Sequence, residues 1–316
     1  MTDHLSCANT CRVCGAMGEH PLFTAREMNS GTGESFRYFQ CQACETLQIE
    51  RIPENLEAHY PPTYYSFRLQ DRHRFVRLFR HLRDVAVLTG NGVVGKLLNL
   101  YAQDLALTPL RCVAGLNPGS RILDIGCGEQ ARVLRRLEAL GFHCLLGIDP
   151  YLQQDRVASR AIVLRRCQVE QVEGKFDVIM FHHSFEHIPD PRGALSAART
   201  IIDPDGMLLI RIPTVSSYAW RRYGVNWAQL DAPRHLHLFS VRAMNAMAKA
   251  SGFNVKSVAY DSTEFQFWGS EQISRGWPLS KKQHVAASAM RQYRREAVRL
   301  NRAEDGDSAA FLLEPA

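Results

Sequence analysis

The sequence lacks the features that mark membrane-spanning, secreted and repetitive proteins. No apolar run approaches the ~18–20 residues that a transmembrane helix needs, and the opening residues, MTDHLSCANTCRVC, have no basic stretch followed by an apolar one. We therefore expect no secretory signal, no membrane span and a cytoplasmic location. There is no internal repeat, and 46% hydrophobic with 22% charged residues is ordinary for a globular chain of 316 residues.

An excess of positive charge is missing from most of the chain. The formal net charge of +6 is carried by residues 281–302, which hold seven Lys or Arg and one acid, so the remainder balances. A second basic stretch, residues 68–83, contains six arginines. A nucleic-acid partner would have to bind these two segments. Because basic amphipathic helices are more often solvated faces, a nucleic-acid partner is the weaker expectation.

Four of the nine cysteines form two CxxC pairs. Two residues separate Cys11 from Cys14 and Cys41 from Cys44, and 26 residues lie between the pairs. Four thiolates at this spacing suit tetrahedral Zn²⁺ with every coordination position filled, which is the pattern of a structural site. A segment of about 60 residues with few large apolar side chains needs such a cross-link to fold. The sequence predicts structural zinc here rather than free or disulfide-bonded cysteines.

The other cysteines have no such spacing. Four of them are isolated among apolar or loop residues and are expected to be buried or half-buried thiols: Cys112, Cys127, Cys144 and Cys167. Cys7 has no role that the sequence indicates.

Strand and helix patterns alternate through the second half of the chain. They occur in the order strand 121–125, helix 129–140, strand 143–148, strand 176–181, helix 191–202, strand 206–212, helix 240–251 and strand 254–260. Such alternation predicts an α/β fold with a doubly wound, mostly parallel, Rossmann-like sheet. The final residues, AEDGDSAAFLLEPA, are expected to fray.

Composition and turn signals divide the chain into four parts. We predict a zinc-ribbon module at 1–60, a helical linker or cap at 61–116, the α/β core at 117–262, and a C-terminal extension at 263–316 with a basic amphipathic helix.

The stretch ILDIGCGEQARVL, residues 122–134, begins like a nucleotide-binding loop. Gly126 and Gly128 follow an apolar strand and precede a helix, where a backbone without Cβ atoms approaches a ligand closely. A dinucleotide loop would have a third glycine, and Gln130 stands near that position instead. Asp149 ends the next strand, 25 residues after Asp124, and a carboxylate there suits a ribose diol. The loop therefore predicts a nucleoside ligand without a pyrophosphate.

These motifs resemble those of the class I S-adenosylmethionine-dependent methyltransferases. ILDIGCG is similar to their first motif, GID to their second, and FDVIMFHHSFEHIPDP with GMLLIRIP to their fourth and fifth, over roughly residues 120–260. The resemblance implies that S-adenosylmethionine is the cofactor and that the chain is an enzyme. It implies further that Asp124, Gly126, Cys127 and Gly128 lie around the methionine moiety, that Asp149 holds the ribose, and that Glu170 lies near the adenine.

Histidines are the candidates for the acceptor side, because methyl transfer requires alignment of the acceptor and often removal of its proton. His182, His183 and His187 follow a central strand, at the sheet edge where ligands bind, and His182 is expected to reach the cofactor. His235 and His237 alternate in an extended segment and are predicted to share one face, beside Arg234, as base and anion clamp. The alternative for this pair is a hydrogen-bonded surface role.

A narrower resemblance concerns the acceptor. The four cysteines, the linker YPPTYYSF, the core and PRHLHLFS together are similar to bacterial methyltransferases of glycan and secondary-metabolite pathways, including nucleotide-sugar C-methyltransferases. A larger C-terminal domain of those C-methyltransferases is missing here, which leaves O- and N-methylation open. The resemblance implies a small polyhydroxylated or sugar-like acceptor, such as a nucleotide sugar or glycan. The segment YDSTEFQFWGSEQ, residues 260–272, either covers this acceptor or forms a strand hairpin.

Two other functions remain as alternatives. Some ribosomal RNA base methyltransferases also carry a zinc ribbon before such a core, and the basic segments would then contact phosphates. A non-catalytic binding protein with a relict core is the other, and the intact glycines and acids of the loop argue against it.

Overall fold

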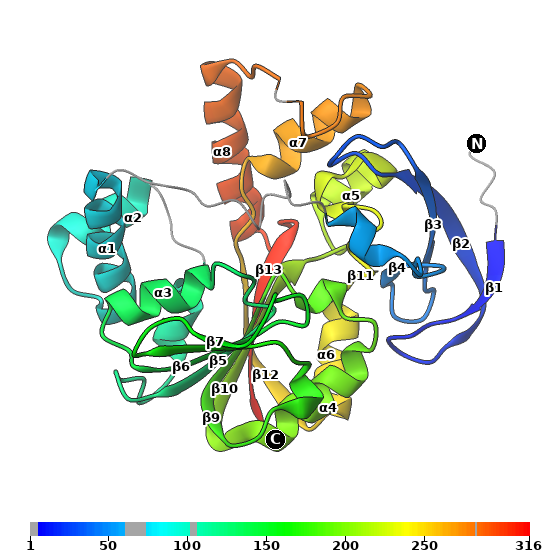
Figure 1. Ribbon diagram of the computed structural model, residues 1–316. Helices are drawn as coiled ribbons and strands as arrows, with labels where there is room; N and C mark the ends of the chain where they lie inside the picture. The colour runs from blue at the N-terminus through cyan, green and yellow to red at the C-terminus, as the bar shows by residue number, and fades with distance from the viewer. Residues whose placement is uncertain (1–5, 61–73, 102–105, 282) are drawn as a thin grey trace.

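The computed structural model describes residues 6–60, 74–101, 106–281 and 283–316 (Figure 1). Most of the linker YPPTYYSF and the first part of the basic stretch 68–83 lie outside the described residues, as does the side chain of Cys7. Among the described residues, no helix combines the length and the apolar character that a membrane crossing requires.

The core of the molecule is an eight-stranded, mostly parallel sheet. In spatial order its strands are β12 (Phe253–Tyr260), β13 (Ser308–Pro315), β10 (Ile202–Pro213), β9 (Phe176–His182), β5 (Arg121–Ile125), β6 (Cys144–Ile148), β8 (Ile162–Arg165) and β7 (Arg156–Val157). The central five strands, from β10 to β8, pair in parallel, whereas β13 is antiparallel to both of its neighbours. The predicted doubly wound α/β fold is confirmed.

Helices cover both faces of this sheet because its central strands are apolar throughout (Figure 1). One face packs against α3 (Arg132–Ala139) and the α1–α2 hairpin, and the other against α4 and α6. The bounds of the remaining helices on these faces are α1 (Arg74–Thr89), α2 (Val93–Tyr101), α4 (Pro191–Ile201) and α6 (Val241–Ala250). This double covering leaves the carboxyl ends of the parallel strands as the open edge for a ligand.

The N-terminal module is a separate, antiparallel sheet at the side of the core. Its strands are β1 (Ser6–Thr10), β2 (Met17–Arg26), β3 (Ser35–Gln40), β4 (Leu47–Ile49) and β11 (His237–Leu238). The fifth strand, β11, comes from the second half of the chain and pairs with β4. Apolar side chains of this sheet, such as Tyr38 and Leu47, pack with Trp227 and Leu238.

The C-terminal extension differs from two expectations. The final residues do not fray: they form β13, which lies between β10 and β12 and buries Ala309, Phe311 and Leu313. The segment 260–272 is not a strand hairpin, because it continues into helix α7 (Phe265–Ser274). The basic helix is α8 (Ala287–Arg302), which packs against α7, and a short helix, α5 (Tyr218–Tyr223), lies beside them.

Strand pairing crosses the four-part division of the chain twice. β11, from the predicted core, completes the N-terminal sheet, and β13, from the predicted extension, completes the core sheet. The four-part division of the chain stays a prediction. Backbone hydrogen bonds nevertheless join the N-terminal module to the core through β11, and the C-terminal extension to the core through β13.

Candidate functional site

A cavity of about 860 Å³ lies at the carboxyl ends of β5, β6 and β9. All six residues that the sequence associates with a cofactor line it: Asp124, Gly126, Cys127, Gly128, Asp149 and Glu170. Tyr60, from the N-terminal segment, and Tyr151 also line it, with their rings stacked 5.8 Å apart between centroids. The volume is sufficient for a nucleoside-sized ligand.

The two glycines of the loop have different structural reasons. Gly126 has φ +76°, and a Cβ there would lie 2.3 Å from Cβ of Ser184, whose hydroxyl donates to the Ile125 carbonyl at 2.5 Å. Gly126 is therefore required by packing. Gly128 has φ +63°, and a Cβ there would meet no protein atom within 4 Å. The positive φ of Gly128 favours glycine whatever the space around it, and because Gly128 lines the cavity, the missing side chain also leaves room for a ligand.

Asp149 is held in place by the same loop. Its Oδ2 accepts a hydrogen bond from the Gly128 amide at 3.0 Å and its Oδ1 from the Tyr151 amide at 2.9 Å. Asp124, at the end of β5, is buried nearby, and burial together with the charge of Asp149 raises the pKa of Asp124 to about 8. Burial also raises the pKa of Asp149, although its two amide hydrogen bonds oppose the shift. The site thus presents a carboxyl group that a cationic ligand would help to ionise.

This arrangement predicts pH-dependent binding of an ammonium-bearing nucleoside. Near pH 6 the Asp124 carboxyl is protonated, because its pKa is about 8, and an ammonium group prefers the carboxylate. Binding must then release a proton, so affinity should rise with pH between 6 and 8, by up to about tenfold per unit. Calorimetry of S-adenosylhomocysteine binding in buffers of different ionisation enthalpy measures this release. Asp124→Asn should bind with no such slope, and a flat profile for the unaltered protein would contradict the assignment.

A second cavity, of about 480 Å³, adjoins the first. His183 and Arg211 line both cavities. The walls of the second cavity are rich in polar groups from the 228–235 loop, the end of β12, the start of α7 and the start of β13. These include Gln229, Asp231, His235, Asp261, Ser262, Gln266, Asp307 and Ser308. A ligand in the second cavity would face a ligand in the first across His183 and Arg211.

The predicted acceptor-side histidines are separated by the structure. His182 lines the first cavity and His235 the second. His237 lines neither: it belongs to β11, is buried, and accepts a hydrogen bond from Nε of Arg12 at 3.3 Å. The expectation that His235 and His237 face one site is wrong, because the chain turns from the cavity into the N-terminal sheet between them.

Arg234 is also not an anion clamp. Its side chain is fully buried, and its guanidinium donates to Glu27 Oε1 at 2.8 Å, to Asp231 Oδ1 at 2.6 Å and to the His59 carbonyl at 2.9 Å. These bonds tie the N-terminal module to the 228–235 loop, so Arg234 has a structural role.

Glu186 is a functional candidate that the sequence reasoning missed. It lies in a single 3-10 turn after β9, is fully buried, and is surrounded by imidazoles. Its Oε1 lies 3.4 Å from Nδ1 of His183 and 3.9 Å from Nε2 of His235. Although burial opposes it, the surrounding histidines lower the pKa of Glu186 to about 2, and burial lowers the pKa of His187. The sequence signal was the motif HHSFEH, in which three histidines flank one acid.

His183 is a second functional candidate at the end of β9, where the sequence favours His182. It has φ +50°, an uncommon backbone conformation for a residue other than glycine, and its ring stands at the junction of the two cavities. Such strain is common at functional positions.

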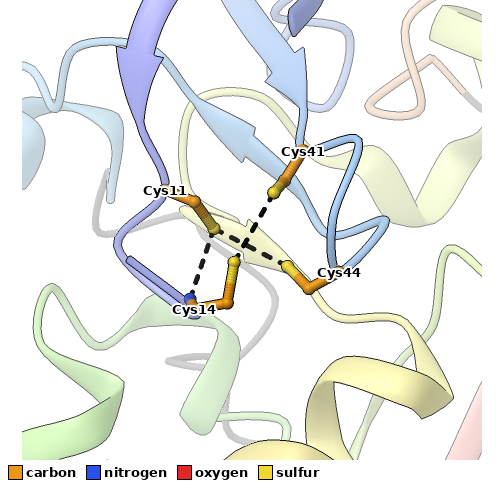
Figure 2. A group of neighbouring side chains, drawn as sticks. All are labelled: Cys11, Cys14, Cys41 and Cys44. Atoms are coloured by element: carbon orange, nitrogen blue, oxygen red, sulfur yellow. Dashed lines mark hydrogen bonds between the residues drawn. The ribbon is translucent and has the colours of Figure 1, made fainter. Parts of the chain in front are cut away.

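The four predicted zinc ligands come together in the two turns that join β1 to β2 and β3 to β4 (Figure 2). The sulfur atoms of Cys11 and Cys44 are 3.6 Å apart, as are those of Cys14 and Cys41. Sulfurs bound tetrahedrally at ~2.3 Å from zinc would be about 3.8 Å apart, so the cluster fits the ion. The Gln48 amide donates to the Cys11 sulfur at 3.0 Å, a contact that favours a thiolate.

The four isolated cysteines follow the expectation only in part. Cys127 and Cys167 are half-buried, as expected, whereas Cys112 and Cys144 are exposed. Cys144 is exposed because it is the first residue of its strand, at the amino edge of the sheet, and Cys112 lies in a surface turn.

The chain is similar in sequence to known methyltransferases. The sequence profile of a methyltransferase domain matches residues 99–258. The ubiquinone biosynthesis O-methyltransferase of Acinetobacter baumannii (strain AYE) is 30% identical over 142 residues, 39% of this chain and 57% of that protein. That of Actinobacillus pleuropneumoniae (serotype 5b, strain L20) is 24% identical over 180 residues, 49% of this chain and 76% of that protein.

The match to curated relatives is partial. The chain spans about half the length of the first of these relatives. Among solved structures, magnesium protoporphyrin IX methyltransferase from Synechocystis PCC 6803 with bound SAH (S-adenosylhomocysteine) is similar with a TM-score of 0.43 and 10% identity, over 83% of this chain and 95% of that one.

Proposed function

Because this chain belongs to the methyltransferase domain family, whose profile covers just over half of it, we propose that it transfers the methyl group of S-adenosylmethionine to a small polyhydroxylated or sugar-like acceptor. The observation that carries the proposal is the pair of adjoining cavities with His183 and Arg211 in common. One cavity holds the cofactor and the other holds the acceptor, so that the methyl group lies between them.

The cofactor assignment follows from the residues around the first cavity. Asp124 faces the ammonium of the methionine moiety, and Gly128 leaves space for it. Asp149, oriented by two backbone amides, accepts hydrogen bonds from the ribose hydroxyls, and Glu170 lies near the adenine. The same arrangement disfavours a dinucleotide, since the loop offers no third glycine for a pyrophosphate.

The acceptor assignment follows from the polarity of the second cavity. Asp231, Asp261 and Asp307 line it, together with hydroxyl and amide side chains. Carboxylate oxygens accept hydrogen bonds from hydroxyl groups, which a polyhydroxylated molecule has in abundance. The curated relatives are named for O-methyl transfer, which favours a hydroxyl oxygen as the methyl acceptor.

His183 is the residue best placed to accept the proton of that hydroxyl. In the transfer, the acceptor oxygen attacks the methyl carbon, the carbon–sulfur bond breaks with its electron pair remaining on sulfur, and the hydroxyl proton goes to the imidazole. Glu186, 3.4 Å from Nδ1 of His183, stabilises the imidazolium that forms. His235 and His182 take positions on the acceptor and cofactor sides.

The four-cysteine cluster is proposed to bind one structural zinc ion. Its sulfur–sulfur separations suit tetrahedral coordination, and four protein ligands leave no position for a substrate. Zinc thiolates persist in a reducing compartment, which supports a cytoplasmic location.

The cofactor assignment is tested by Asp149→Ala. Loss of hydrogen bonds to a charged group costs about 1–3 kcal/mol, so S-adenosylhomocysteine should bind roughly 5- to 150-fold more weakly. Asp205→Ala, an exposed carboxylate near the amino end of β10, is the matched control and should bind normally. Calorimetry with both variants, and with NAD, decides the point. Unchanged affinity in Asp149→Ala, or saturable binding of NAD, would mean that the ribose is misassigned.

A further inference from the structure

We propose that Glu186, His187 and His235 form a second metal site, which binds a divalent transition-metal ion such as Zn²⁺ or Mn²⁺ at the boundary of the two cavities. One potential ligand atom from each residue lies within 4.8 Å of the others. Two imidazoles and one carboxylate form a ligand set suited to these ions, and it leaves coordination positions open. The site is separate from the four-cysteine cluster in ligands and chemistry.

The two histidines are held in the orientation that a metal ligand needs. Nδ1 of His187 lies 2.8 Å from the Arg234 carbonyl oxygen, and Nδ1 of His235 lies 2.7 Å from the Gln229 carbonyl oxygen. A carbonyl oxygen only accepts, so each Nδ1 carries the hydrogen and each Nε2 keeps its lone pair. Metal-binding histidines in proteins are oriented in this way by backbone carbonyls.

Glu186 supplies the independent observation. It is fully buried, yet neither of its carboxylate oxygens accepts a hydrogen bond from any residue that the structure describes. Its contacts with His183 and His235, at 3.4 and 3.9 Å, are longer than hydrogen bonds to a charged group. A buried carboxylate without hydrogen bonds is unstable unless a positive charge compensates it. A metal ion held by Glu186 and the two imidazoles would supply that charge.

The position of the cluster gives the ion a role, which rests on the function proposed above. His187 lines the cofactor cavity and His235 the acceptor cavity, so an ion held by these residues would lie between the two cavities and would have a coordination position for an acceptor hydroxyl. A divalent ion lowers the pKa of a hydroxyl that binds to it. The coordinated hydroxyl loses its proton to His183, and its oxygen attacks the methyl carbon while the carbon–sulfur electron pair stays on sulfur. His183 does not ligate the ion in this arrangement and remains the base.

Metal counting on the full chain tests the site without any acceptor. After incubation with excess Zn²⁺ or Mn²⁺ and removal of free metal, elemental analysis should give two ions per chain, counting the zinc of the cysteine cluster. A mild chelator should remove one of them first, since a three-ligand site holds its ion less tightly. Loss of a residue that only hydrogen-bonds to a metal ligand weakens metal binding roughly 10–100-fold. Because Glu186→Gln and His235→Gln remove a ligand itself, each should weaken binding of the second ion by at least that factor. His143→Ala, an exposed histidine at the amino edge of the sheet, should retain both ions.

The outcomes separate this site from the proposed function. Glu186→Gln and His235→Gln disturb different segments, so one folded variant, judged by circular dichroism and by S-adenosylhomocysteine binding, is sufficient. If both variants fail to fold, the unaltered chain can be loaded with Co²⁺ in competition with Zn²⁺. Co²⁺ at the cysteine cluster gives a thiolate charge-transfer absorption, whereas Co²⁺ bound by nitrogen and oxygen ligands does not, so the absorption spectrum distinguishes the two sites. A single ion per chain under all conditions overturns the proposal. Two ions without S-adenosylhomocysteine binding would retain the site and overturn the methyltransferase function.

Discussion

Cys41→Ser is expected to release the proposed zinc ion and to loosen both the N-terminal module and the 228–235 loop, which lines the second cavity. Structural zinc sites contribute apparent binding free energies of about 10–16 kcal/mol, so loss of a ligand is a large effect. The loosening should spread because the cluster packs against Phe239, and Ser240 donates to the Cys44 carbonyl at 2.5 Å. Elemental analysis measures the zinc, and hydrogen exchange measures the protection of residues 1–60 and 228–239.

The matched control for this prediction is Cys112→Ser. Cys112 is exposed and lies in a surface turn away from the cluster, so its serine variant should keep one zinc ion and normal exchange. If Cys41→Ser retained stoichiometric zinc, the four-thiolate site would be wrong. If zinc were lost but hydrogen exchange in residues 228–239 were unchanged, the pairing of β11 with β4 would not carry the loosening from the cysteine cluster to this segment.

His183→Ala is expected to lower methyl transfer by roughly 100- to 10,000-fold, the usual cost of losing a general base. Affinity for the cofactor should change little, because the proposed main contacts come from Asp124, Gly128 and Asp149. The measurement is turnover with methyl-labelled S-adenosylmethionine and an acceptor identified by screening polyhydroxylated compounds. His143→Ala serves as the control. Near-normal turnover in His183→Ala would mean that the enzyme acts by aligning the acceptor with the methyl group, without a general base.

The parts of the fold that could be predicted are those with local patterns. Each strand and helix expected between β5 and β12 is observed to within a few residues, whereas β7, β8, α5 and β11, which lie among them, were not expected. Helix α3 begins at Arg132, three residues later than expected, since Ala131 has the left-handed φ of +42° that ends the glycine loop. The four cysteines were found by spacing alone, because two residues between thiols is the separation that a turn around one ion requires.

The parts that could not be predicted depend on long-range pairing. FLLEPA carries an apolar pattern, but only Leu208 and its neighbours in β10, about 100 residues earlier, make it a strand. His235 and His237 have the two-residue spacing of a shared face, yet backbone pairing of His237 with Gln48 draws the chain away from the cavity. No local property of HLH reveals that partner, so the direction of the two side chains was not accessible from the sequence.

The position of β13 also bears on how the chain reaches its native state. Leu208 of β10 pairs with Leu313, and β12, which ends at Tyr260, cannot join the sheet except through β13. One edge of β10 therefore stays unpaired until β13 pairs with it. In the sequence β13 follows α7 and α8, so this pairing joins segments that are far apart along the chain. Contacts of such high sequence separation slow folding, and an open apolar strand edge invites association with other chains. Refolding from denaturant should therefore show a late, concentration-sensitive phase in which β10, β12 and β13 gain exchange protection together.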